Sequence, residues 1–293
     1  MMAADGWYIY TGREVVPRHV TRVRIHESLT VIPARAFQGN LDIEELDCHD
    51  RVKTVEENAF YCCFSLRIVI MPGVTVVERY AFDNCNALTD VECDKLERIG
   101  YEAFSWCKSL TIINLPSAKI VERYAFAHCE ALTNVIFGKE LESIGEWAFY
   151  CCTSLEQITI PLNDGIITDD SIFGVCEKLK HIDLVEGEQL RDTIAALLLE
   201  EWKNDMNDKL GVINQSLPTT PAGDEYEDVG EKALAIRRWI RTVLRNIDRY
   251  KAQHHSYLNE AATTLQLALP QDIVIKNVLS FLELPSYTFE GED

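Results

Sequence analysis

The sequence predicts an α/β repeat solenoid with a stack of about eight short parallel strands, followed by a C-terminal α-helical hairpin that could form a coiled coil. Three observations support this prediction: an Ala-Phe pair recurs along the chain, apolar residues alternate between these pairs, and heptad spacing dominates the last third. The 293 residues are 47% hydrophobic and 26% charged, as in ordinary folded domains. We therefore expect a solenoid with an N-terminal cap over residues 1–187 and a helical region over residues 188–293.

Phenylalanine marks the repeat. It recurs at intervals of 22 to 24 residues, as Phe37, Phe60, Phe82, Phe104, Phe126, Phe149 and Phe173. Three residues after these come Asn40, Cys63, Cys85, Cys107, Cys129, Cys152 and Cys176. An apolar residue also stands six positions after every Phe and five positions before it, with Thr168 as the exception. A unit of this length cannot bury its own hydrophobic face, so neighbouring units must stack in register.

Each repeat also contains a short segment in which two apolar residues are separated by one position. The first such pair is Val23 and Ile25, and the last is Ile182 and Leu184. A period of two is typical of a strand that buries one face. This pattern predicts eight strands, each followed by a compact return segment that carries the Ala-Phe pair.

The strand pattern L-x-x-V-x-L and the return segments VVERYAFDNC and SIGEWAFYCC resemble the BspA-like class of leucine-rich repeats, over roughly Val20 to Leu184. The resemblance implies a curved solenoid with a parallel sheet on its concave side, used for binding other proteins. Many relatives are cell-surface proteins with signal sequences. Residues Met1 to Arg13 have neither the basic start nor the apolar stretch of such a signal, and no run of about 18 apolar residues is present. We expect a cytoplasmic, intracellular protein.

The ten cysteines fit the repeat better than a disulfide or metal framework. Six of them stand three residues after a repeat phenylalanine, and Cys48 and Cys93 take apolar strand positions. No two cysteines are three positions apart, as zinc sites usually require. Equivalent cysteines in successive turns would lie about 4.8 Å apart, within the range for disulfides, but intracellular thiols are usually reduced. We predict reduced, buried thiols and no metal or cofactor.

Side chains that alternate with the buried strand positions must point out of the sheet, on its concave side. They are the candidate partner-binding residues: Glu45, Asp47, His49, Ile68, Ile70, Asp90, Glu92, Asp94, Ile112, Asn114, Asn134, Ile136, Gln157, Thr159, His181 and Asp183. The four isoleucines are predicted to form a small apolar group with acidic residues at both ends, an arrangement that often marks an interaction site. The alternative is that the C-terminal helices or a second protomer cover them.

Charge and motifs restrict the function further. The net charge of −19, from 47 acidic and 28 basic residues, disfavours nucleic acid and anionic membranes as partners. No phosphate-binding glycine loop, HExxH, GxSxG or DxDxDG pattern occurs, so we expect no catalytic residues and no enzyme activity. The leading hypothesis is a non-enzymatic scaffold whose concave face binds a protein with basic residues around an apolar contact.

Two helices are predicted in the C-terminal region. Residues 188–213 carry one apolar stripe, formed by Ile194, Leu198, Trp202, Met206 and Leu210, and residues 215–228 form an acidic loop with Pro and Gly. Residues 228–268 carry a heptad seam of Ile236, Ile240, Val243, Ile247, Tyr250, His254, Tyr257 and Ala261. The alternative function is therefore a structural or assembly module that self-associates through residues 236–261. His254 and its neighbour His255 are interpreted as packing residues rather than metal ligands.

Two further features of this region allow more than one interpretation. Arg237, Arg241, Arg245 and Arg249 line one helix face, either as a docking stripe for an acidic partner or nucleic acid or, as we favour, as partners of the first helix or a solvated face. The hairpin would place Arg237 opposite Asp205 and Arg241 opposite Glu201. The segment Leu269 to Pro285 resembles the opening of an F-box, which implies a third hypothesis, a ubiquitin-ligase adaptor. Only eight residues follow it, too few to complete that domain.

Overall fold

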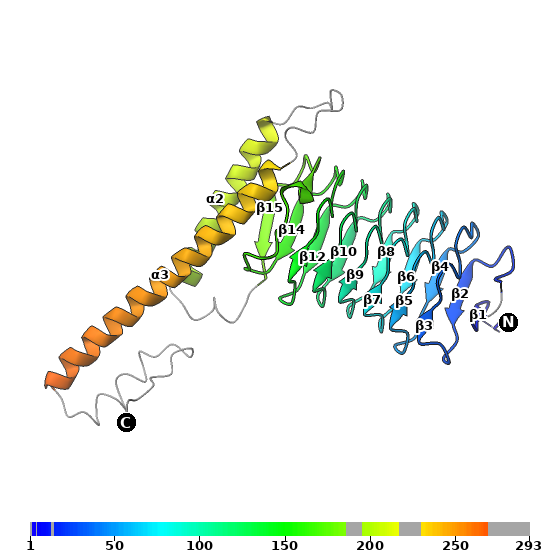
Figure 1. Ribbon diagram of the computed structural model, residues 1–293, viewed down its shortest axis with the longest axis horizontal. Helices are drawn as coiled ribbons and strands as arrows, with labels where there is room; N and C mark the ends of the chain where they lie inside the picture. The colour runs from blue at the N-terminus through cyan, green and yellow to red at the C-terminus, as the bar shows by residue number, and fades with distance from the viewer. Residues whose placement is uncertain (1, 4, 13–14, 186–194, 217–229, 269–293) are drawn as a thin grey trace.

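The computed structural model describes residues 2–3, 5–12, 15–185, 195–216 and 230–268 (Figure 1). It is a solenoid of stacked turns with two long helices at its C-terminal end. Parallel strands on one side of the turns form the main face of the solenoid. Shorter strands on the return segments form a second sheet. The predicted repeat solenoid is confirmed.

The strands of the main face follow the order of the chain. They are β1 (Tyr8–Tyr10), β2 (Arg22–Ile25), β4 (Glu45–Asp47), β6 (Ile68–Ile70), β8 (Asp90–Glu92), β10 (Ile112–Leu115), β12 (Asn134–Phe137), β14 (Gln157–Ile160) and β15 (His181–Leu184). Equivalent residues of successive repeats lie side by side, so Leu46 pairs with Val69 and Val69 with Val91. The eight predicted strands are β2 to β15 of this set, and β1 extends the stack at its N-terminal end.

The return segments also contribute strands, which the sequence analysis did not predict. They are β3 (Val31–Ile32), β5 (Thr54–Val55), β7 (Val76–Val77), β9 (Arg98–Ile99), β11 (Ile120–Val121) and β13 (Ser143–Ile144), joined in one six-stranded parallel sheet. Each is only two residues long, too short for a periodic signal. Their second residue is the apolar residue five positions before Phe, and it is buried in every case.

The main face is interrupted once. Its strands form two hydrogen-bonded sheets, one ending at β8 and the other beginning at β10. Between later turns, the amides of Thr133 and Asn134 both donate to Thr111 O, at 2.8 and 3.4 Å. No corresponding bond runs from Thr111 or Ile112 to the β8 turn in the described chain. The second sheet continues past this point, because Ile99 pairs with Val121.

The core consists of ladders of identical residues, as the repeat predicted. The seven phenylalanine rings stack at centroid distances that run from 4.7 Å for Phe37–Phe60 to 5.9 Å for Phe149–Phe173. The thiol of each ladder cysteine donates to the carbonyl of the phenylalanine in the preceding turn, for example from Cys63 Sγ to Phe37 O at 3.0 Å. All ten cysteines are free thiols in the structure. Each of these phenylalanine carbonyls also accepts a backbone hydrogen bond, such as that from Asn40 N to Phe37 O at 3.0 Å, so the thiol is a second donor to the same oxygen.

The turns around the phenylalanines are tight because, in six of the seven, two residues adopt left-handed backbone conformations. These residues stand two positions before and two positions after Phe, and their φ angles include 57° at Tyr80, 58° at Trp106 and 58° at His128. Gly39 takes the second of these positions in the first turn, with φ of 69°. Residues other than glycine adopt this region at an energetic cost.

In the last complete turn the apolar position that precedes phenylalanine is shifted by one residue, which is why Thr168 does not fit the repeat. Ile167, one position earlier, forms the bridge to Ile144 that extends the second sheet and is buried. Thr168 is exposed and donates its hydroxyl proton to Ile144 O at 2.6 Å. The chain then enters a short 3-10 helix, η1 (Asp170–Phe173), whose first turn Asp169 caps. The apolar position is therefore kept and shifted by one residue.

Two helices, α2 (Ala195–Ser216) and α3 (Glu231–Ala268), close the C-terminal end of the solenoid. Helix α2 packs on β15, and Asn207 and Asn214 hydrogen-bond the backbone of Ile182 and Leu179. Helix α3 packs on η1, where Lys232 donates to Cys176 O. The last repeat would otherwise expose an unpaired strand edge and an open core, so the two helices act as a cap.

The helices differ in part from their predictions. Helix α2 continues through Gln215 and Ser216, which were expected in the loop, while residues 186–194 and 217–229 lie outside the described residues. The expected pairs of Arg237 with Asp205 and of Arg241 with Glu201 are wrong. Arg237 contacts Asp170 at 2.9 Å and donates to Ile167 O, and Arg241 lies 3.9 Å from Asp164. The arginines face the solenoid because α3 packs on η1 as well as on α2.

The heptad seam is used inside the cap. Ile236, Ile240, Val243 and Ile247 are buried, together with Met206 and Leu210 of α2. Trp239 donates its indole proton to Trp202 O, and Trp202 stacks on Tyr250. A coiled coil is not confirmed, and these four residues are buried inside the cap. The side chains of His254, His255, Tyr257 and Ala261, and the F-box-like segment 269–285, lie outside the described residues.

Candidate protein-binding face

The sixteen residues predicted to point away from the core do so, because none of them is buried. Their strands alternate between buried and accessible side chains, as in the half-buried, buried, half-buried pattern of β6. The register places them in rows across the main face, so that Glu45, Ile68 and Asp90 form one row. Asp47, Ile70 and Glu92 form the next. Whether these rows bind a partner is a separate question, which depends on charge and exposure.

Acidic residues at the N-terminal end of the face are neutralised by the neighbouring strand. Glu45 accepts a hydrogen bond from Arg22 at 2.9 Å, and Asp47 accepts one from Arg24 at 2.8 Å. Arg24 also contacts Asp5, and hydrogen bonds to both carboxylates raise the pKa of its guanidinium. These acids therefore offer little net charge to a partner.

The sequence analysis missed Arg22 and Arg24, although the signal was present. Both alternate with Val23 and Ile25, so the same period of two that selected the other face residues places them on the main face. Both guanidinium groups lie over the ring of Trp7, at 4.3 and 4.8 Å from its centroid. Trp7 comes from the N-terminal cap, where no repeat pattern could predict its position.

Strand β8 carries the acidic residues that have no counter-charge. Asp90, Glu92 and the following Asp94 are exposed, and none forms an ion pair with any described residue. Thr89 donates its hydroxyl proton to Asp90 at 2.7 Å. The net negative charge of the face is therefore concentrated in the middle, next to the interruption between β8 and β10, and not at both ends.

The isoleucines do not form the single group that was expected. Ile68 and Ile70 on β6 are half-buried, and β8 separates them from Ile112 and Ile136. Ile112 pairs in register with Asn134, and Asn114 with Ile136. Ile112 is 54% exposed, which is unusual for a side chain of this size. The centre of the face is thus an acidic strand with an apolar strand on each side.

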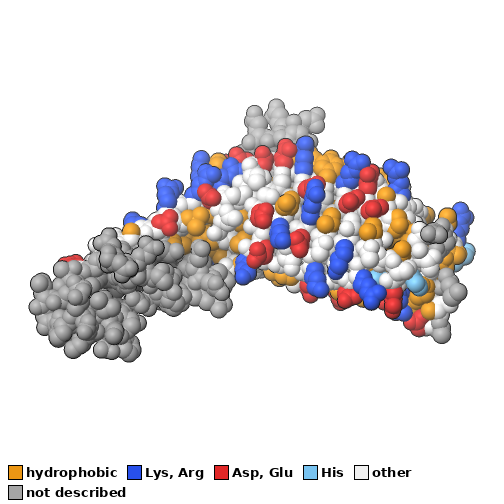
Figure 2. All heavy atoms as spheres, turned by 60° about the horizontal axis from the view of Figure 1, so that its bottom comes forward, with side chains coloured by type: hydrophobic (Ala, Val, Ile, Leu, Met, Phe, Trp, Pro, Cys, Tyr) orange, Lys and Arg blue, Asp and Glu red, His pale blue; other side chains and the backbone are white. Residues whose placement is uncertain are grey.

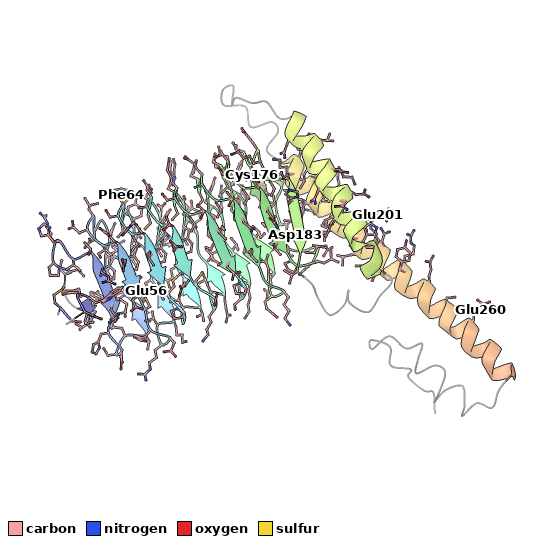
Figure 3. The ribbon with its side chains drawn as sticks, turned by 180° about the vertical axis from the view of Figure 1, so that it is seen from behind. Glu56, Phe64, Cys176, Asp183, Glu201 and Glu260 are labelled. Carbon is pink, nitrogen blue, oxygen red and sulfur yellow. The ribbon has the colours of Figure 1, made fainter. Side chains whose placement is uncertain are left out.

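The C-terminal end of the face is polar and belongs to the cap. Gln157 donates to Asp183, which also contacts Lys203 of α2 at 3.2 Å. Asp183 lies beside the helices in Figure 3. His49 is held at the other end by its contact with His26 O at 3.1 Å. His181 is exposed, and Thr159 is half-buried. The described helices α2 and α3 pack on β15 and η1 and leave the strands from β6 to β12 open (Figure 1).

Several other kinds of site are not found in the part of the chain that the structure describes. No group of three or more His, Cys, Asp or Glu side chains there is arranged to hold a metal ion. No described helix is both long enough and apolar enough to cross a membrane. A crevice of about 450 Å³ between α2 and α3 is lined by Trp202, Trp239, Lys209 and Arg238 among others, and it opens to solvent.

Comparison with known proteins places the repeats in a family. A family model described as the BspA type leucine rich repeat region matches residues 18–120 and 97–193, more than half of the chain, with six copies. The chain belongs to this family. Leucine-rich repeat proteins of this family are generally non-enzymatic. No curated protein matches the sequence.

Two solved structures of leucine-rich repeat proteins are similar to this chain. A leucine-rich repeat protein from Bacteroides ovatus is 25% identical with a TM-score of 0.50, covering 61% of this chain and 46% of that protein. A leucine-rich repeat protein from T. pallidum is 26% identical with a TM-score of 0.41, covering 62% of this chain and 77% of that protein. The chain therefore spans about half the length of the B. ovatus protein.

Proposed function

We propose that this BspA-type protein is a non-enzymatic scaffold that binds another protein at the centre of its main face. The observation that carries the proposal is the arrangement around β8. Asp90, Glu92 and Asp94 are exposed without ion-pair partners among the described residues, and apolar side chains lie on both neighbouring strands. Exposed apolar side chains next to charged ones often mark a site of interaction with another protein.

The partner expected from this chemistry has lysine or arginine side chains next to aliphatic ones. Its basic groups would meet Asp90 and Glu92, and its aliphatic groups would cover Ile112 and Ile68. Burial of apolar surface contributes roughly 25 cal/mol per Å², so the isoleucines would supply affinity. The carboxylates would mainly accelerate association and select the register, because exposed ion pairs contribute only about 0–1 kcal/mol.

The interrupted ladder between β8 and β10 adds polar groups to the same place. The amides of Thr111 and Ile112 do not pair with β8, and both residues are exposed. Their counterparts in the next turn are bonded to Thr111 O. These free donors can hydrogen-bond the backbone of a partner, which gives the centre of the face charged, apolar and backbone recognition together.

The proposal is tested with charge reversal at matched positions. A peptide-display library is selected on the wild-type protein, and we expect peptides enriched in lysine or arginine beside aliphatic residues. The double variant Asp90→Lys/Glu92→Lys should weaken these peptides at least tenfold. The control Glu140→Lys/Glu142→Lys makes the same charge change at exposed positions near the second sheet and should have little effect. Equal loss in both variants would mean that only overall charge matters, and acidic peptides would contradict the proposal.

A further inference from the structure

Seven aromatic side chains on the return segments form one continuous chain of ring contacts. In order of contact they are Tyr80, Tyr101, Tyr124, Trp147, Tyr150, His128 and Trp106. Neighbouring centroids lie 4.1 to 6.4 Å apart, the closest being Trp106 on His128 and the longest Tyr124 on Trp147. All seven are half-buried, so one part of each ring reaches solvent. We call this set the aromatic horseshoe.

Small side chains stand between the two arms of the horseshoe. Asp83, Ser105 and Ala127 occupy the same position, directly after Phe, in three successive turns. Backbone bonds hold these turns in register, including Asn84 N to Ser105 O and Trp106 N to Ala127 O, at 2.9 and 2.8 Å. Larger residues take the position in the flanking turns, Tyr61 on one side and Tyr150 on the other. The three turns between Tyr61 and Tyr150 therefore carry small, buried side chains at this position, which we call the floor of the horseshoe.

The floor contains an acceptor with no partner. Asp83 is only 4% exposed, and its Oδ1 atom is buried without a hydrogen bond among the described residues. Asn84 hydrogen-bonds the same carboxyl group, and burial raises its pKa to about 7. Glu102, half-buried at the same site, adds a second negative charge nearby. A buried carboxylate oxygen that lacks a donor is unfavourable unless something supplies one.

The fold does not need bulky rings at these positions. Tyr80, Tyr124, Trp147, Trp106 and His128 all have φ angles between 56° and 58°, in the left-handed region. Equivalent positions in other turns adopt the same region with other residue types: Arg35, Gly39, Asn58, Cys62, Asn84, Glu102, Cys151 and Val175. The turns therefore close without aromatic side chains, and the backbone does not require a ring at these positions.

The exposed faces of the rings already attract cations. Lys108 lies over Trp106, and Arg123 over Tyr124, each at 4.8 Å from the ring centroid. Both cations are anchored by carboxylates of the next turn, Glu130 at 2.7 Å and Glu146 at 3.2 Å. Aromatic rings bind cations through the negative potential of their faces, and the effect is strongest where water is excluded.

We propose that the aromatic horseshoe is a second docking surface, which receives a lysine or arginine side chain of a protein partner between its rings, with its charge directed towards Asp83 and Glu102. The site is separate from the main face and does not depend on the proposed function. The competing explanation is that the rings only seal the turns. In that case substitutions change stability and have no effect on ligands.

The test uses the full chain labelled with nitrogen-15 in its tryptophans. It is titrated with the peptide acetyl-Gly-Lys-Gly-Arg-Gly-amide, while the indole N–H signals of Trp106 and Trp147 are followed. We expect these two signals to move in a saturable way and the peptide with glutamine at both basic positions to leave them unchanged. Asp83→Asn and Trp106→Asn/His128→Asn should each weaken binding at least fivefold, with Trp147 as the reporter in the second. Asparagine is chosen because Asn84 already adopts this backbone conformation.

Two controls separate this site from the main face and from general effects. Asp90→Lys/Glu92→Lys should leave the response of Trp106 and Trp147 intact, and so should Phe64→Ala, which removes an exposed ring outside the horseshoe. Indole signals that do not respond to the basic peptide, or that respond equally in the Asp83 and Trp106/His128 variants, would overturn the proposal. Loss of the response in the main-face variant would also overturn it, because binding would then lie elsewhere.

Discussion

Buried thiols are the residues that define how this protein should respond to pH. Cys63, Cys93 and Cys129 are buried, and burial raises the pKa of each thiol to about 12. The pKa values of Cys85, Cys107 and Cys152 are raised well above normal for the same reason. Their function is structural, since each ladder thiol donates to a phenylalanine carbonyl. Reactivity requires an accessible thiolate, which these residues do not offer.

Alkaline solution should therefore unfold the protein. An unfolded thiol titrates near pH 8.5, so between about pH 8.5 and 12 the unfolded state loses protons that the folded state keeps. Each thiol with a raised pKa then lowers the free energy of unfolding by about 1.4 kcal/mol per pH unit. Lys232 acts in the opposite direction, because burial lowers its pKa to about 8 and deprotonation relieves a buried charge. One lysine cannot offset several thiols.

Urea denaturation at pH 7.5, 9, 10 and 11 measures this effect. We expect a falling free energy of unfolding above pH 9, with a smaller slope in Cys107→Ala, which removes one ladder thiol. The variant is less stable at every pH because of the space it leaves, so the slope is the informative quantity. Stability that stays constant from pH 9 to 11, or an identical slope in the variant, would contradict the prediction.

The cap formed by α2 and α3 shows how elements without the repeat complete a repeat protein. Solenoid ends need a polar outer layer and partners for their last backbone groups. Here asparagine, lysine and arginine side chains supply these partners, at Ile182, Leu179, Cys176 and Ile167. Arg237 is the clearest case, since it joins α3 to both Asp170 and Ile167 O.

Loss of Arg237 should destabilise the cap. In Arg237→Ala the carbonyl of Ile167 loses its donor and the contact with Asp170 disappears, and an unsatisfied buried acceptor costs about 1–3 kcal/mol. Arg245→Ala is the matched control, because Arg245 is exposed and its guanidinium donates only to Arg241 O within the same helix. Thermal melts should show a lower Tm for Arg237→Ala. For Arg245→Ala the Tm should hardly move, because its free energy of unfolding should change by no more than about 0.5 kcal/mol. Equal effects would place the stabilisation elsewhere.

The solenoid distributes its charge through contacts between turns. Arg79 pairs with Glu57, Arg98 with Glu122 and Lys180 with Glu156, each across to an adjacent turn. Figure 2 shows acidic and basic side chains interspersed over the face it presents. The net charge of −19 is therefore not a uniform field. The negative charge is strongest where acidic residues have no basic partner among the described residues, as on β8.

The interruption between β8 and β10 should be visible in hydrogen exchange. Amides of Thr111 and Ile112 lack the bonds that their counterparts Thr133 and Asn134 make, so they are open to solvent in the native state. We expect their exchange to be at least tenfold faster than that of Thr133 and Asn134. Mass spectrometry or NMR can resolve these positions. Equal protection of both pairs would mean that the ladder is continuous in solution. Slower exchange on adding a main-face peptide would also support the proposed binding site.

The sequence by itself determined the stacking, the register and the outward direction of the face residues. A period of about two dozen residues allows one solution in which Phe, Cys and Leu lie against their equivalents, and a strand period of two then assigns each side chain to a side. Arg22 and Arg24 were equally predictable, since they follow the same alternation. The two-residue strands of the second sheet were not, because they are too short for any periodicity.

Only the tertiary structure decided which charges remain unpaired and where the ladder is interrupted. Glu45 and Asp90 look alike in the sequence, but one lies beside an arginine and the other beside Ile68 and Ile112. Arg237 and Arg241 of α3 contact the solenoid because of how the helix packs, which heptad spacing does not encode. Seven aromatic residues from four turns meet on one surface for the same reason. Contacts between turns depend on three-dimensional neighbours, and a local pattern specifies only the residue's own turn.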